Sequence, residues 1–108
     1  MMATGLGESQ RKFTRMVADL ITFVYDSGYE LSFGDAYRDP RCSYGKERSL
    51  HKSRLAIDLN LFKDGRWLTD TEDHRPFGEY WESQGGSWGG RFKDGDGNHY
   101  SLAFDGMR

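Results

Sequence analysis

The chain has 108 residues, which is the size of one ordinary domain and leaves no room for a second. Apolar residues make up 36% of it, including 7 Phe, 6 Tyr and 3 Trp, which is enough to build one compact core. The 15 basic and 17 acidic residues leave a net charge of −2. This composition argues against disorder and against a dedicated nucleic-acid binder, which carries an excess of Lys and Arg.

Cysteine content and hydropathy exclude further classes of protein. The single cysteine, Cys42, excludes an internal disulfide and any zinc site built from cysteines, and its neighbours do not mark it as a nucleophile. The longest apolar stretch lies within residues 17–25, far short of the ~20 residues that cross a bilayer. No export signal is visible at the N-terminus. We therefore expect a protein that is made in a cytoplasm and does not insert into a membrane.

A long helix is the first element expected. Residues 1–7 read as a flexible tail, and a helix is predicted over residues 8–27, with Ser9 as its N-cap and Gly28 ending it. Apolar residues recur there at the spacing of one helical face: Phe13, Met16, Val17, Leu20, Ile21 and Val24. We expect this face to pack on the core rather than on a partner protein.

Two strands are expected next, at residues 29–33 and 55–62, separated by a long loop over residues 34–49. The second strand alternates strictly, with Leu and Ile on one face and Asp58 in the middle of the other. An Asp-Gly turn follows at residues 64–65, and a return strand begins at Trp67.

The remainder is predicted to hold a short helix over residues 77–84, a glycine-rich loop over residues 87–97 and a final strand over residues 99–104. These elements predict a small α+β domain in which the N-terminal helix packs on an antiparallel sheet. We expect a polar cleft on one side of the sheet.

The residues that carry chemistry surround this cleft. Asp58 lies in the most apolar strand, where a carboxylate must be paired, hydrogen-bonded or bound to a metal. His51 precedes it by seven residues, and His99 opens another strand with Asp96 three residues before it. Two His and one carboxylate, with a fourth position left for water, are the ligands of many catalytic zinc sites, and a further carboxylate supplies the general base. By spacing alone this is a moderate signal.

The order of these residues resembles a known family. The chain reads Ser49-x-His51-x-x-x-x-Ala56-x-Asp58, then Trp88-Gly89-Gly90, then Asp96-x-x-His99. This pattern resembles the zinc peptidase family of D-Ala-D-Ala carboxypeptidases and phage L-alanyl-D-glutamate endolysins. One position departs from it, because Arg54 stands where the family has Gly.

The resemblance implies a role for each motif residue. It implies that His51, Asp58 and His99 hold Zn²⁺ and that Asp96 is the general base. It points to Arg38 as a residue that holds substrate or stabilises the oxyanion, although a loop salt bridge is the alternative for this arginine. It also implies that the Ser49 hydroxyl contacts the ligand shell or the substrate.

Other motifs have plainer explanations. Residues 94–98 imitate the start of a calcium loop, but His99 stands where that loop needs Gly. His74 lies among charged residues and is expected at the surface, Trp81 is expected in the core, and residues 88–90 are expected to shape the backbone behind the site.

The function implied by the resemblance is that of a zinc-dependent peptidoglycan peptidase in one catalytic domain, residues 8–108, with a zinc-containing cleft on one side of the sheet. We expect a monomeric phage endolysin that cleaves the L-Ala–D-Glu bond of the stem peptide. It would be made in the host cytoplasm and reach the periplasm and cell wall at lysis. The alternatives are a D-Ala-D-Ala carboxypeptidase or dipeptidase, and a non-catalytic zinc-bearing module that binds the cell wall. We expect neither nucleic acid nor membrane as a partner.

Overall fold

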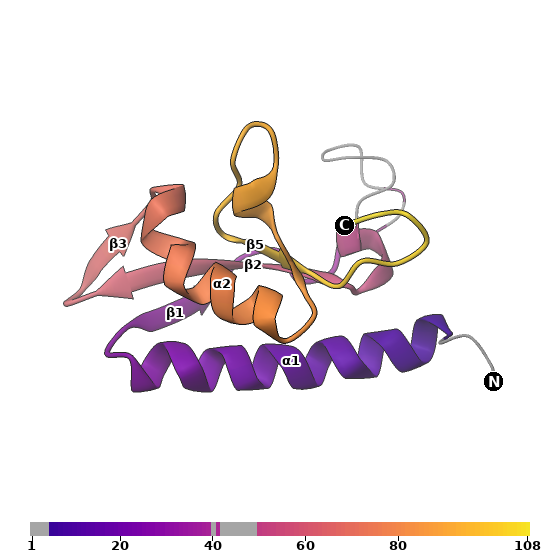
Figure 1. Cartoon of the computed structure of the whole chain (residues 1–108), viewed down its shortest axis with the longest axis horizontal. Helices are drawn as coiled ribbons and strands as arrows, with labels where there is room; N and C mark the ends of the chain where they lie inside the picture. The colour runs from indigo at the N-terminus through magenta and orange to yellow at the C-terminus, as the bar shows by residue number, and fades with distance from the viewer. Residues whose placement is uncertain (1–4, 40, 42–49) are drawn as a thin grey trace.

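A computed structural model describes residues 5–39, 41 and 50–108. Two helices pack against one face of a five-stranded antiparallel sheet (Figure 1). The predicted α+β domain, with its N-terminal helix on an antiparallel sheet, is confirmed. Cys42, Ser49 and most of the expected tail over residues 1–7 lie outside the described residues. No helix within the described ranges combines the length and the apolar character needed to span a membrane.

Helix α1, Leu6–Asp26, begins two residues before the predicted start. Ser9 is not its N-cap: Gly5 takes that position, and the Ser9 amide donates to the Gly5 carbonyl inside the first turn. Gly28 follows the helix with φ +88°, a conformation that glycine adopts without steric cost. The predicted apolar face packs on the core and buries Phe13, Met16, Leu20 and Val24.

Strand β2, Ala56–Lys63, is the centre of the sheet. Strand β1, Glu30–Phe33, pairs with one edge of it. The other edge pairs with β5, His99–Ser101, near the start of β2 and with β3, Arg66–Leu68, near its end. Asp64 and Gly65 both have positive φ, 52° and 77°, as the predicted two-residue hairpin requires.

Four short elements escaped prediction. The segment over residues 87–97 is not a loop throughout, since it contains β4, Ser87–Trp88, and a 3₁₀ turn, Gly89–Arg91. Two more 3₁₀ turns lie at Leu50–Ser53 and Thr71–His74. Such pieces are too short to show a hydrophobic period, so the sequence carries no signal for them.

The core lies between the helices and the Leu/Ile face of β2. Helix α2, Arg75–Ser83, matches the predicted short helix and packs against α1 and β4. Trp81 of α2 is fully buried, and its indole N–H donates to the Ser101 carbonyl at 2.8 Å. The Leu and Ile residues of β2 face the same core, so Asp58 faces the opposite side of the sheet.

Arg54 has a left-handed backbone conformation, which glycine adopts without steric cost. This conformation is a physical reason for the glycine that the resembled family has at this position. Arg54 lies between the first 3₁₀ turn and β2 with φ +58°, in the left-handed region that costs an L-residue roughly 1–2 kcal/mol. Its guanidinium carbon lies 4.0 Å from the centre of the Tyr37 ring. A cation–π contact at the surface contributes about 0.5–1 kcal/mol, so it offsets part of this strain.

This geometry predicts the stability of two variants. Arg54→Gly and Arg54→Ala both remove the contact with Tyr37, but only glycine relieves the strain at positive φ. We expect Arg54→Gly to be more stable than Arg54→Ala by about 1 kcal/mol, although alanine restricts the unfolded chain more. Urea unfolding of the two variants measures the difference. An alanine variant as stable as the glycine variant would contradict the left-handed conformation.

Candidate metal centre

Strand register brings two of the three predicted ligands together. Asp58 of β2 stands directly opposite His99 of β5, and such cross-strand partners have Cβ atoms roughly 4.5–5.5 Å apart on one face. His51 comes from the 3₁₀ turn that leads into β2. Two hydrogen bonds hold this turn, from the Leu55 amide to the Leu50 carbonyl at 2.9 Å and from the Arg38 amide to the His51 carbonyl at 3.0 Å.

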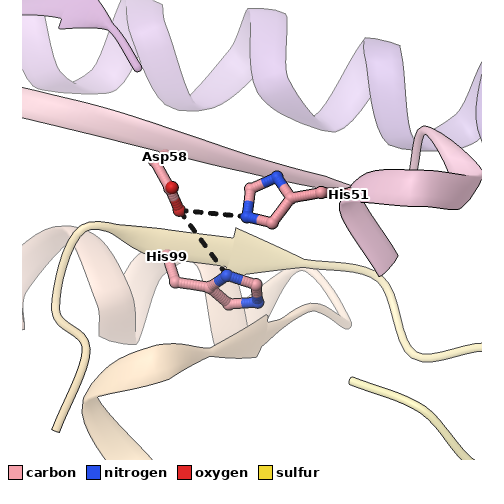
Figure 2. Close-up of side chains that lie close together, drawn as sticks. All are labelled: His51, Asp58 and His99. Carbon is pink, nitrogen blue, oxygen red and sulfur yellow. Dashed lines mark ion pairs between the residues drawn. The ribbon is translucent and has the colours of Figure 1, made fainter. Parts of the chain in front are cut away.

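The three side chains converge on one point. Asp58 Oδ1 lies 3.2 Å from His51 Nε2 and 3.6 Å from His99 Nδ1 (Figure 2). All three donor atoms lie within 4.8 Å of one another. Both histidines are buried, and the Asp58 side chain is 23% exposed, so the group opens to solvent on the side of the carboxylate.

The chemistry of this group fits a divalent metal. Burial raises the pKa of Asp58, but the His51 and His99 imidazoles lower it more, and the result is about 2. The carboxylate is therefore ionised at ordinary pH. Asp58 Oδ1 is buried yet accepts no well-directed hydrogen bond from the described residues. Two imidazole nitrogens and one carboxylate oxygen that face each other in this way form a ligand set suited to zinc, with one position left open.

Asp96 is held next to this group by its backbone. Its amide donates to the Gly89 carbonyl at 2.8 Å, and its carbonyl accepts from the His99 amide at 3.1 Å. A Cβ at Gly89 would lie 2.2 Å from the Asp96 carbonyl oxygen and 2.7 Å from His99 Cβ. Only glycine fits there. The Trp88 indole N–H donates to the Gly97 carbonyl at 2.7 Å, so residues 88–90 shape the backbone behind the site, as predicted.

Arg38 lies on the His51 side of the site. Its side chain is buried, and its guanidinium donates to Asp35 Oδ2 at 3.0 Å. The loop that carries it follows β2, because the Gly34 amide donates to the Asp58 carbonyl and the Asp58 amide donates to the Asp35 carbonyl, each at 2.8 Å. The loop salt bridge therefore exists. The roles of Arg38 and Asp96 toward a substrate stay predictions.

His74 is not at the surface, and this prediction was wrong. It is only 2% exposed, and a hydrogen bond joins its Nδ1 to Tyr100 Oη at 2.9 Å. Burial lowers the pKa of His74 to about 4 and raises that of Tyr100. The charged residues around His74 in the sequence point elsewhere, since Glu72 pairs with Arg75. Only the packing of the 3₁₀ turn against β5 reveals the burial.

His74 also lines a cavity of about 190 Å³ that the sequence did not indicate. The cavity lies beside β2, where β3 has ended and β5 has not begun. Asp96 and Asn60 line it from the side of the metal group, and Trp67 lines it from β3. The candidate metal centre therefore continues into a hollow along the same strand.

Comparison with known proteins establishes the family. Residues 43–102, more than half of the chain, match a family model described as D-alanyl-D-alanine carboxypeptidase. The chain belongs to this peptidase family. No match is found among curated protein sequences. The crystal structure of the L-Ala D-Glu endopeptidase ChiX of Serratia marcescens is similar with a TM-score of 0.68 and 18% sequence identity, over 96% of this chain and 91% of that chain. At this identity the likeness shows a shared fold.

The buried histidine of this carboxypeptidase-family member predicts a pH dependence. The unfolded chain takes up a proton on His74 below pH 6.5, whereas the folded chain does so only near pH 4. The free energy of unfolding should therefore fall as pH falls from 6.5 to 4, by up to about 3 kcal/mol. His74→Gln, which does not titrate, should remove this part of the decrease. Urea unfolding with a chelator present measures the free energy of unfolding of the wild type and of His74→Gln at each pH. If the two free energies fall in parallel between pH 6.5 and 4, His74 is not the group responsible.

Proposed function

We propose that this protein is a zinc-dependent peptidoglycan peptidase that cleaves the L-Ala–D-Glu bond of the stem peptide. The convergence of His51, Asp58 and His99, with donor atoms within 4.8 Å of one another, is the observation that carries the proposal. Asp96 is anchored three residues before His99 and is not part of this group, so a carboxylate remains for proton transfer.

Zinc held by these three residues would polarise the scissile carbonyl and lower the pKa of a water molecule, so that this water could lose a proton and attack the carbonyl carbon. The Asp96 carboxylate takes the proton from the attacking water and then passes it to the leaving amine. Arg38 contributes positive charge on the His51 side, where a guanidinium can hold a carboxylate or a developing oxyanion. Burial of the Arg38 side chain and its ion pair with Asp35 hold the guanidinium in place.

The choice of bond is supported by the structural neighbour, which is an L-Ala D-Glu endopeptidase. Its fold is shared along almost the whole chain. The description of the family model favours a second candidate, removal of terminal D-Ala by a carboxypeptidase. The two activities need the same metal group and differ in the surfaces that bind the two sides of the scissile bond.

The biological setting is also part of the proposal. We infer a monomeric phage endolysin that is made in the host cytoplasm and meets the cell wall at lysis. The site combines a group suited to a metal with a separate carboxylate. This combination favours an enzyme over a module that only binds the cell wall, because a structural zinc site needs no additional carboxylate.

Product analysis tests the reaction and its metal together. We expect digestion of purified peptidoglycan to produce new D-Glu N-termini by mass spectrometry, with one zinc ion per chain by metal analysis. His51→Ala should lose both the metal and the activity, since two ligands remain. Loss of terminal D-Ala instead would favour the carboxypeptidase, and full activity of metal-free protein would contradict the mechanism.

The general base is tested separately from the ligands. Asp96→Asn should keep the zinc and the fold but lower kcat by a factor of about 10² to 10⁴, the usual contribution of a positioned acid–base group. Asp94→Asn is the matched control, because Asp94 is an exposed carboxylate of the same turn and should tolerate the change. If Asp96→Asn loses its zinc, or if Asp94 is the sensitive residue, the assignment is wrong.

A further inference from the structure

We propose that the cavity beside Asp96 and the exposed indole of Trp67 bind the N-terminal side of the scissile bond. The cavity takes the acylated alanine, and the indole takes the amino sugar to which that alanine is attached. The inference rests on the proposed L-Ala–D-Glu cleavage, because only then does the sugar lie next to the reacting residue.

The position of the cavity follows from the strand. Asn60 is two residues after Asp58 in β2, so both side chains belong to the same face, one pleat apart. The Leu59 amide donates to the Asn98 carbonyl at 2.9 Å, which holds the cavity wall against β2. Asp96 belongs to the same wall. A chain bound across the metal group can therefore run from the Arg38 side, past Asp96, into this cavity.

The charges of the two sides differ. On the His51 side lies the buried Arg38 guanidinium, which pairs with Asp35. The described residues that line the cavity include one carboxylate, that of Asp96, and neither Lys nor Arg. His74 is neutral there, because burial lowers its pKa to about 4. A free carboxylate on the substrate is therefore favoured on the Arg38 side and disfavoured in the cavity. The part of the stem peptide without a carboxylate is its acylated alanine end.

The walls of the cavity are polar and fixed. The Gly97 amide donates to Thr71 Oγ1 at 3.2 Å, and Asn60 Nδ2 donates to Ser32 Oγ at 3.3 Å. Its volume of about 190 Å³ lies below the ~300–1,000 Å³ of pockets for drug-sized ligands. The space suits a small amide unit that makes hydrogen bonds, such as an N-acyl alanine, and does not suit a long peptide.

Trp67 differs from the other two tryptophans. Trp81 and Trp88 are buried with bonded indole N–H groups, whereas Trp67 is 63% exposed at the mouth of the cavity. Among the described residues, Trp67 takes part in no ring or cation contact. An indole face carries partial negative charge and attracts the C–H groups on the face of a pyranose ring. A sugar joined to the alanine in the cavity would reach this face.

Two substrates that differ only in the sugar test the inference. N-acetylmuramyl-L-alanyl-D-isoglutamine contains it, and D-lactoyl-L-alanyl-D-isoglutamine, which keeps the same acyl group on the alanine, does not. We expect the zinc-loaded wild type to cleave the first with a kcat/KM about three- to tenfold higher. Trp67→Ala should abolish this preference, by lowering kcat/KM for the sugar-containing substrate more than for the sugar-free one. Tyr25→Ala, which removes an exposed aromatic residue on α1, is the matched control and should keep the preference.

The outcomes separate this inference from the proposed function. If the wild type cleaves both substrates equally well, or if Trp67→Ala lowers kcat/KM for both by the same factor, the sugar subsite is wrong while the L-Ala–D-Glu activity stands. If neither substrate is cleaved but a stem pentapeptide loses its terminal D-Ala, the proposed bond is wrong and the subsite falls with it. A preference that disappears only in Trp67→Ala supports both.

Discussion

The Asp58 carboxylate lies in the central strand of the sheet, and the rest of the site is arranged around the cost of placing a charge there. A bare buried carboxylate is prohibitively expensive, so it needs partners with compensating charge or a metal. His99 reaches it through strand register and His51 through the turn before β2. Together they hold the pKa of Asp58 near 2 against the effect of burial. The same arrangement that makes the charge tolerable presents three metal donors to one point.

The site also requires that neighbouring backbone segments pack closely together. Glycines allow this at positions where a Cβ atom would lie too close to the neighbouring segment. Gly34 brings the loop of Arg38 against β2, where a Cβ would lie 3.1 Å from Asp58 Cβ. Gly89 brings the Asp96 turn against His99 on the other side. Arg54 is the exception, since it keeps a left-handed backbone without being glycine and stacks on Tyr37. Substitution of the family glycine therefore changes the strain of the turn and leaves the ligands in place.

The two sides of the candidate metal group differ in charge. This difference would favour one orientation of a charged substrate over the other. The His51 side carries the buried Arg38 guanidinium with its partner Asp35, and the other side opens into a polar cavity in which the described lining residues include neither Lys nor Arg. A stem peptide carries its carboxylates on one side of the alanine and a sugar on the other. Under the proposed function, the orientation of the substrate follows from this difference before any contact with the metal is considered.

By itself the sequence determined the helices, the two main strands and the hairpin, because hydrophobic period and turn residues are local properties. It singled out His51, Asp58 and His99 through their resemblance to a known family, and the fold brings these three side chains together. It misplaced His74 and the N-cap, and it missed β4 and the 3₁₀ turns. Only the tertiary structure decided these features. The burial of His74 depends on Tyr100, 26 residues away, and the cavity depends on where β3 ends and β5 begins along β2. Contacts between segments distant in the chain leave no period or spacing from which they could be read.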